Sequence, residues 1–148
     1  MLDVGDQAPD FELNDDEGNV VSLSELVSAG PLIVYFYPAD FTPGCTAEAC
    51  EIRDMHADIT EVNATIVGIS PQSESSHARF KKRYELPFKL LYDRNKTVIR
   101  AFGVNGPMGF GVRRVTYLIS KDKLIEKRVL ADFAVKQHIR FIEEVDQR

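Results

Sequence analysis

The chain has 148 residues, of which 44% are hydrophobic and 28% charged, and its formal net charge is −5. This length and composition predict one globular domain, residues 1–148, with a sizeable core. The acidic balance argues against a nucleic-acid partner, and the apolar runs are too short to span a membrane. Residues 1–6 lack the basic and apolar regions of a signal peptide, so we expect a cytoplasmic protein.

The N-terminal part of the chain predicts a β-hairpin followed by a short helix. Residues 11–13 and 20–23 can pair as strands across residues 14–19, whose Asn, Asp and Gly content is typical of a turn. Ser24 is expected to cap a helix over residues 25–28.

The stretch from residue 32 to residue 53, LIVYFYPADFTPGCTAEACEIR, is the most informative part of the chain. Residues 32–37 are apolar, β-branched or aromatic and predict a buried strand. Pro38 ends this strand because proline has no N–H for the ladder. Thr42 and Pro43 then suit the N-cap and the first position of a helix.

Both cysteines of the chain fall in the first turns of this helix, which we expect over residues 43–60. The partial positive charge and the free N–H groups of a helix N-terminus favour thiolate over thiol at Cys45. The thiolate is the nucleophilic form of cysteine. Cys50 follows five residues later, and a close pair in a reducing compartment is more often catalytic, redox-sensing or metal-binding than structural.

The rest of the chain alternates between strands and helices. The expected strands cover residues 64–70, 88–93, 114–120 and 124–130. The expected helices cover residues 73–84, with Ser73 as cap, 97–102 and 134–145. Residues 104–111 are rich in glycine and predict a loop. Crossover helices between core strands predict an α/β fold with a mixed central β-sheet flanked by helices, in which chemistry is often placed at the C-terminal end of a strand.

Pro38-x-x-x-Thr42-x-x-Cys45 resembles the active-site motif of the peroxiredoxins, which are thiol peroxidases of thioredoxin-like fold. The longer pattern TPGCTAEAC, from Thr42 to Cys50, is similar to the bacterioferritin-comigratory-protein (PrxQ) branch, whose resolving cysteine lies five residues after the peroxidatic one. Residues 5–13 and 80–93 also resemble this family, so the resemblance covers nearly the whole chain. It implies a thioredoxin-like fold and reduction of hydrogen peroxide and organic hydroperoxides.

The resemblance also implies a role for each residue of the site. Cys45 would attack the peroxide and become a sulfenic acid, and Cys50 would resolve it as an intramolecular disulfide. The hydroxyl of Thr42, which we also expect to cap the helix, and the N–H groups around Gly44 and Cys45 would bind peroxide oxygen. Arg114, just before the strand TYLI, would supply a positive charge at any working pH.

Two further residues support this arrangement. Pro38 would shield the sulfur from bulk water, and Glu48 would orient Arg114 through a charge-assisted hydrogen bond. The simpler alternatives are a first-turn glutamate favoured by the helix dipole and a surface arginine, and Arg113 is a rival for the position of Arg114.

The expected partners are a peroxide substrate and thioredoxin or a similar dithiol reductant. We expect neither a cofactor nor a metal, and no nucleic-acid or membrane partner, while a monomer and a homodimer remain equally open. The segment NGPMGFG, residues 105–111, replaces the aromatic and charged segment of the family, and the chain has no tryptophan. The rim of the pocket is therefore expected to differ from that of the family.

The spacing of the two cysteines carries a geometric prediction. In an intact helix the Cα atoms of residues five apart lie about 8–9 Å apart, whereas a disulfide needs about 4.4–6.8 Å. A bond between Cys45 and Cys50 therefore requires the first turns of the helix to unwind.

Three other functions remain open. A disulfide oxidoreductase of thioredoxin type would have C-x-x-C in place of C-x-x-x-x-C. A metal-binding module would use Cys45, Cys50 and His56, which are few ligands at a spacing unlike that of zinc fingers. A redox-sensing or binding domain would keep the fold without the activity. All three histidines are interpreted as surface or helix-face residues: His56, His77 and His138.

Overall fold

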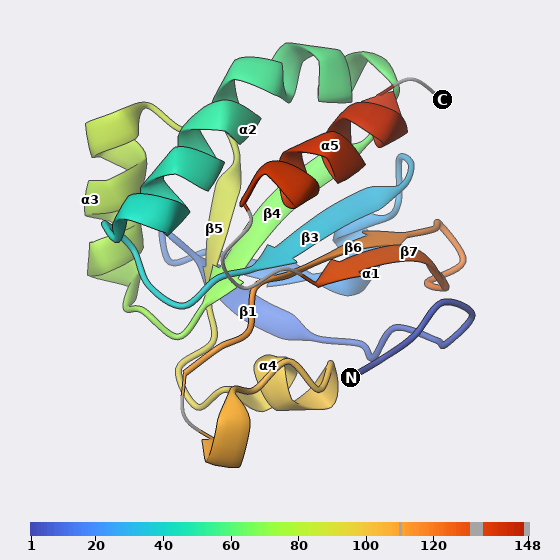
Figure 1. The fold of residues 1–148 in the computed structure, drawn as a ribbon, viewed down its shortest axis with the longest axis horizontal. Helices are drawn as coiled ribbons and strands as arrows, with labels where there is room; N and C mark the ends of the chain where they lie inside the picture. The colour runs from blue at the N-terminus through green and yellow to red at the C-terminus, as the bar shows by residue number, and fades with distance from the viewer. Residues whose placement is uncertain (110, 131–134, 147–148) are drawn as a thin grey trace.

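The computed structural model describes residues 1–109, 111–130 and 135–146. A seven-stranded mixed sheet forms its centre, in the order β2-β1-β5-β4-β3-β6-β7 (Figure 1). The strands are β1 (Glu12–Asp15), β2 (Val20–Ser22), β3 (Leu32–Phe36), β4 (Thr65–Ser70), β5 (Lys89–Tyr92), β6 (Val115–Ile119) and β7 (Ile125–Leu130). The mixed sheet and the N-terminal hairpin β1–β2 confirm the predicted fold class.

Helices cover both faces of this sheet (Figure 1). They are α1 (Leu23–Leu26), α2 (Pro43–Glu61), α3 (Glu74–Tyr84), α4 (Thr97–Ala101) and α5 (Val135–Asp146). Helices α2 and α5 lie side by side on one face. Among the described residues, no helix combines the length and the apolar character that a membrane crossing needs.

Strand β3 is buried on both faces, as its continuous apolar run predicts. Because side chains alternate along a strand, Ile33 and Tyr35 pack in the core layer with α2, α3 and α5. Val34 and Phe36 pack in the opposite layer with α1 and α4. The side chains that point toward α2 are therefore every second residue of β3.

The pairing of β3 decides which distant segments meet at its C-terminal end. Strand β4 runs parallel to it and β6 runs antiparallel, with Phe36 opposite Val115. The first residue of β6 therefore lies beside the last residue of β3. Arg114, one residue before β6, is thereby placed next to the loop that connects β3 to α2.

Helix α1 begins earlier than predicted. The predicted cap Ser24 is wrong, because Ser22 occupies the N-cap and its Oγ accepts the N–H of Glu25 at 3.2 Å. Ser22 and Glu25 form the S-x-x-E pattern of a capping box, which the sequence contains. The predicted cap of α3 is confirmed, since Ser73 Oγ accepts the N–H of Ser76 at 3.1 Å.

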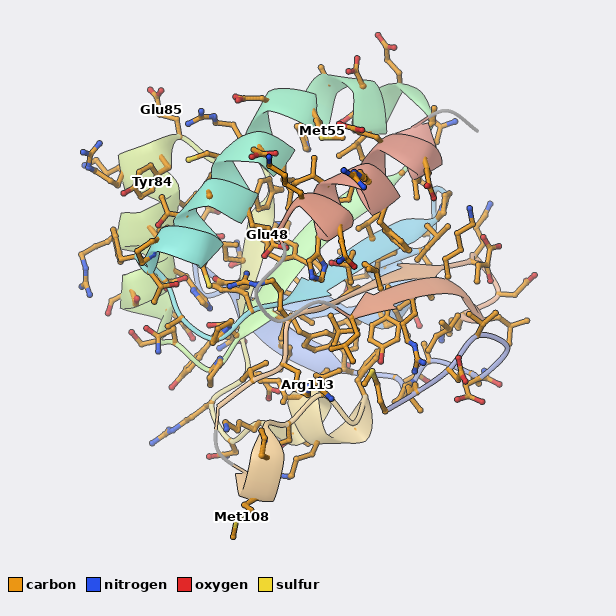
Figure 2. The ribbon with its side chains drawn as sticks, in the orientation of Figure 1. Glu48, Met55, Tyr84, Glu85, Met108 and Arg113 are labelled. Atoms are coloured by element: carbon orange, nitrogen blue, oxygen red, sulfur yellow. The ribbon has the colours of Figure 1, made fainter. Side chains whose placement is uncertain are left out.

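The predicted glycine-rich loop over residues 104–111 is described except for residue 110, and its described part is not wholly irregular. It contains a short 3-10 turn, η1 (Pro107–Gly109), in which Met108 has a φ of 56° and a side chain that points outward (Figure 2). The ammonium of Lys96 donates to Asn105 Oδ1 at 3.2 Å and to the Gly111 carbonyl at 2.9 Å. These bonds hold the segment against the residue that precedes α4.

Candidate active site

Cys45 lies at the N-terminus of α2 and is buried, with 1% of its surface exposed. The first hydrogen bond of the helix joins the N–H of Thr46 to the Thr42 carbonyl at 2.8 Å. The N–H groups of Gly44 and Cys45 come before this bond and therefore face the end of the helix. Their dipoles favour a negative charge on the sulfur or on an oxygen bound there.

The guanidinium of Arg114 joins the two functional side chains of α2. Its Nη2 donates to Cys45 Sγ at 3.2 Å, and its Nη1 donates to Glu48 Oε1 at 2.7 Å. The predicted contact between Glu48 and Arg114 is therefore present. Arg114, and not the alternative Arg113, is the arginine that contacts Glu48 and Cys45. Burial would lower the pKa of Arg114, but the negative charges of Glu48 and Cys45 raise it above its ordinary value.

Glu48 lies on the inner side of α2 and is fully buried (Figure 2). Burial raises the pKa of Glu48 to about 7, and the charge and hydrogen bond of Arg114 act in the opposite direction. Among the described residues, its second oxygen, Oε2, is buried without a hydrogen-bond partner. The hydroxyl of Tyr35, on the same side of β3, is the other such atom.

Thr42 occupies the N-cap of α2, but the predicted capping hydrogen bond is wrong. Its Oγ1 donates instead to the Ala39 carbonyl at 3.1 Å, so the proton of the hydroxyl is directed away from the helix. The lone pairs of Oγ1 are then available to accept a hydrogen bond. Pro38, which is half-buried, belongs to the same loop between β3 and α2.

Cys50 is half-buried on α2, and neither cysteine is in a disulfide. Helix α2 is continuous from Pro43 to Glu61 and includes both. Three residues after Cys50, the Nη1 of Arg53 donates to the Tyr84 carbonyl at 2.8 Å and ties α2 to the end of α3. The two thiols are thus held apart by an intact helix, as the spacing of the sequence predicts.

The loop before α2 is anchored by a buried carboxylate that sequence reasoning missed. Asp40 Oδ1 accepts from the Tyr37 hydroxyl at 2.6 Å, and Oδ2 accepts from Ser76 Oγ at 2.7 Å and from His77 Nδ1 at 2.8 Å. Burial alone would raise the pKa of Asp40, but these hydrogen bonds, with that of His77 first, lower it. His77 Nε2 lies 3.1 Å from the Leu91 carbonyl, so each of the two ring nitrogens faces an oxygen acceptor.

The interpretation of the histidines as surface residues is wrong for two of them. His77 and His138 are fully buried, and His56 is half-buried. The Nδ1 of His138, on α5, lies 2.7 Å from Thr116 Oγ1. A signal was present, because His138 precedes Ile142 by four residues and therefore lies on the apolar face of α5.

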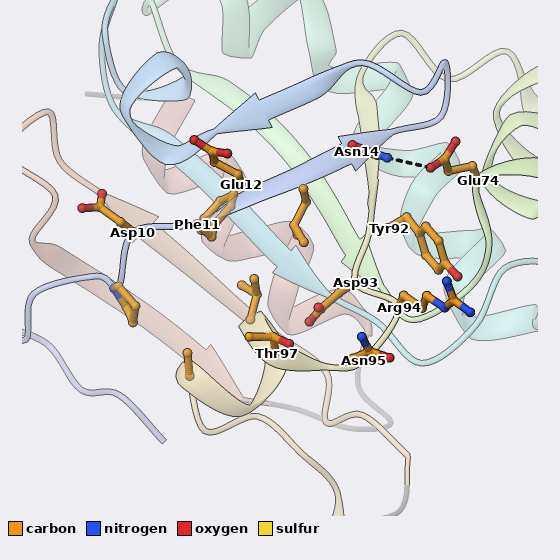
Figure 3. A pocket seen from close by; sticks show the side chains of 14 residues that line it. Asp10, Phe11, Glu12, Asn14, Glu74, Tyr92, Asp93, Arg94, Asn95 and Thr97 are labelled. Atoms are coloured by element: carbon orange, nitrogen blue, oxygen red, sulfur yellow. Dashed lines mark hydrogen bonds between the residues drawn. The ribbon is translucent and has the colours of Figure 1, made fainter.

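A pocket of about 530 Å³ lies between β1 and α4 (Figure 3). Its walls include Phe11, Asp93 and Thr97, and the side-chain amide of Asn14 donates to Glu74 at 2.9 Å at one end. None of its lining residues is a predicted site residue, so this pocket is separate from the chemistry of the thiols. Among the residues that the structure describes, no cluster of three or more metal-ligating side chains supports the metal-binding alternative.

A buried cysteine at a helix N-terminus, hydrogen-bonded to an arginine on a mixed sheet, defines a thiol-based oxidoreductase of thioredoxin-like fold. A profile of the AhpC/TSA family matches residues 4–128. The chain therefore belongs to the AhpC/TSA family, within which it is similar to the peroxiredoxins of the Bcp and PrxQ type.

The relatives support this assignment along most of the chain. Peroxiredoxin Bcp of Bacillus subtilis is 40% identical over 144 residues, which are 93% of this chain and 90% of that protein. The chloroplastic peroxiredoxin Q of Oryza sativa subsp. japonica is 41% identical over 91% of this chain, which spans 62% of that protein. The crystal structure of peroxidoxin BcpB from Mycobacterium tuberculosis has a TM-score of 0.92 at 36% identity, covering 99% of this chain and 97% of that one.

Proposed function

We propose that this protein is a thioredoxin-dependent peroxidase that reduces hydrogen peroxide and organic hydroperoxides at Cys45. The observation that carries the proposal is the hydrogen bond from Arg114 Nη2 to Cys45 Sγ at 3.2 Å, at the N-terminus of a helix. A cationic donor and the helix dipole both stabilise a thiolate, and the same donors stabilise an oxyanion that leaves during attack.

In the first step, the Cys45 thiolate attacks the nearer oxygen of ROOH. The S–O bond forms and the O–O bond breaks, so that the sulfur is oxidised to a sulfenic acid and the leaving RO⁻ takes a proton to become an alcohol or water. The N–H groups of Gly44 and Cys45 and the guanidinium of Arg114 stabilise the developing negative charge. Thr42 Oγ1, whose proton is given to Ala39, accepts the hydrogen bond of the peroxide O–H and aligns it.

In the second step, the Cys50 thiolate attacks the sulfenic sulfur, the S–S bond forms, and the hydroxyl leaves as water. Helix α2 has to unwind over its first turns because its intact geometry holds the two residues about 8–9 Å apart at Cα. Glu48 lies between the two cysteines in the sequence and has to leave Arg114 in this step. Thioredoxin or a similar dithiol then reduces the disulfide and allows the helix to re-form.

Peroxide consumption by the reduced protein tests this assignment. Cys45→Ser and Cys50→Ser form a matched pair, since both exchange a sulfur for an oxygen on the same helix. We expect Cys45→Ser to lose peroxide consumption. Cys50→Ser is expected to consume about one equivalent and to stop at a sulfenic acid, seen by thiol counting and by a mass increase of one oxygen.

Two results would refute the proposal. A wild-type rate no higher than that of a free thiol would leave a thioredoxin-like domain whose cysteines sense or bind. Continuous turnover by Cys50→Ser with thioredoxin would show that Cys50 is not the resolving residue. Thiol–disulfide exchange without peroxide consumption would instead favour a disulfide oxidoreductase.

Two properties of the cellular protein remain predictions. A cytoplasmic location is one of them, and cell fractionation tests it. A monomer and a homodimer are distinguished by the mass of the reduced and oxidised proteins in solution.

A further inference from the structure

Glu48 Oε1 is bound by Arg114, but Oε2 has no hydrogen-bond partner among the described residues. A buried carboxylate oxygen without a donor is costly. Its neighbourhood should therefore contain a group that compensates for the charge.

His138 is placed to be that group. Its Nδ1 lies 3.9 Å from Glu48 Oε2, and both side chains are fully buried. The two residues come from α2 and α5, which pack side by side (Figure 1). The same Nδ1 is 2.7 Å from Thr116 Oγ1, so this hydroxyl fixes the ring next to the carboxylate.

We propose that His138 is a positioning residue that keeps Glu48 in its charged form. The charged Glu48 in turn fixes the Arg114 guanidinium, which donates to Cys45 Sγ. The four side chains form one line of alternating charge across the buried site when His138 is a cation, Glu48 a carboxylate and Cys45 a thiolate. The consequence for peroxide reduction rests on the proposed function, whereas the coupling of His138 to Glu48 does not.

Among the described residues, the groups near Glu48 come from different elements: Tyr35 on β3, Arg114 before β6, and His138 on α5. Cys45, three residues earlier on α2, shares the Arg114 guanidinium with Glu48. The pKa of the Tyr35 hydroxyl is raised well above 10.0 by burial, so this group stays neutral. Burial raises the pKa of Glu48 to about 7, and its charge therefore depends on its neighbours at neutral pH.

A protonated Glu48 would hold Arg114 through a neutral carbonyl oxygen, which is a weaker acceptor than a carboxylate. A cationic His138 opposes this protonation by attraction at short range. Loss of the imidazole should therefore raise the proton affinity of Glu48 and loosen the placement of the guanidinium.

Carbon-13 NMR of the Glu48 side-chain carboxyl measures this coupling directly, and Glu48→Gln identifies the signal. We expect His138→Asn to move the midpoint of the Glu48 titration upward by at least about one pH unit, a tenfold change in proton affinity. His56→Asn is the matched control, because it makes the same exchange at a half-buried position of α2, eight residues beyond Glu48, and should leave the midpoint unchanged.

Thr116→Val is expected to shift the Glu48 titration midpoint in the opposite direction to His138→Asn. It also tests the proposal if His138→Asn does not fold. It keeps the imidazole and removes only the hydroxyl that lies 2.7 Å from Nδ1, so that Nδ1 can approach Glu48 Oε2 more closely than 3.9 Å. The midpoint of Glu48 should then move downward. Unchanged midpoints in the folded variants would overturn the proposal.

The effect on the reaction is read from the pH profile of the rate of Cys45 oxidation. The shift caused by His138→Asn should follow the NMR midpoint and should be absent in the Glu48→Gln background. An equal shift in both backgrounds would show that His138 acts on the site by another route and would refute the proposal. If the protein reduced no peroxide at all, the NMR titration would still decide the coupling, so the two failures are distinguishable.

Discussion

Arg114 uses two different nitrogens for two different acceptors, Glu48 Oε1 and Cys45 Sγ, and lysine cannot do this. Arg114→Lys keeps a positive charge near the site but offers one compact ammonium in place of the planar fork. The ammonium is expected to stay with the Glu48 carboxylate, which the fork contacts at 2.7 Å, rather than with Cys45 Sγ at 3.2 Å. The substitution therefore separates charge from geometry.

A charge-assisted hydrogen bond is worth about 1.5–3 kcal/mol, and each 1.36 kcal/mol changes a rate about tenfold. Arg114→Lys should therefore slow Cys45 oxidation by roughly 10- to 150-fold while the fold keeps most of its stability. Arg114→Ala should lower the free energy of unfolding by about 3–5 kcal/mol as well, because Glu48 would remain buried without its cation.

Competition with a haem peroxidase for hydrogen peroxide measures the rate without an intrinsic reporter, which suits a chain that has no tryptophan. Urea unfolding measures the stability, and Arg113→Lys is the matched control. A wild-type rate in Arg114→Lys would show that positive charge alone is sufficient and would refute the reasoning from the fork.

Three further outcomes follow from the contacts described. Burial would raise the pKa of Asp40, but its hydrogen bonds, that of His77 first, hold this pKa below 3.8 in the folded protein. The stabilisation that they give is complete above 3.8 and is lost as the pH falls through the lower pKa of the folded state. Urea unfolding from about pH 6 to pH 3 should therefore show a falling free energy of unfolding, and Asp40→Asn should make this fall smaller. An added Cβ at Gly68 would lie 2.7 Å from Tyr35 Cζ, so Gly68→Ala should cost about 1–3 kcal/mol in thermal or urea unfolding, and an unchanged midpoint would contradict this. In the disulfide form, amide hydrogen exchange should be faster in the first turns of α2 than in the reduced form, whereas amides beyond Arg53 should keep their protection; equal protection in both forms would exclude unwinding.

The elements with strong local signals could be predicted from the sequence. Strand β3 follows from a continuous apolar run, and α2 begins where Thr42 and Pro43 indicate it. The contact between Glu48 and Arg114 could be expected only through the resemblance to a family. The physical reason for it, the antiparallel pairing that brings Val115 beside Phe36, is a long-range feature that local patterns do not encode.

The errors concern side chains that had more than one possible partner. Ser22 and Ser24 are both plausible caps, and only the capping box with Glu25 separates them. The hydroxyl of Thr42 had a choice between the helix and the Ala39 carbonyl, and the backbone of the loop decides it. The burial of His77 and His138 depends on packing between the helices and the sheet, although the spacing of His138 and Ile142 already placed His138 on the apolar face of α5.

The position of Glu48 between the two cysteines links the oxidation state of the protein to its affinity for substrate. Closing the disulfide has to draw this part of α2 away from Arg114. The disulfide form therefore lacks the arrangement of Cys45, Glu48 and Arg114 that reacts with peroxide. The peroxide then reacts with the reduced, helical form of this segment, and the dithiol reductant reacts with its unwound disulfide form. The two reactants therefore do not compete for one form of the protein. A small molecule that clamps the first turns of α2 in helical form would leave attack on peroxide intact and hold the sulfenic acid open to a second peroxide, so it would convert a catalytic cycle into irreversible loss of the enzyme.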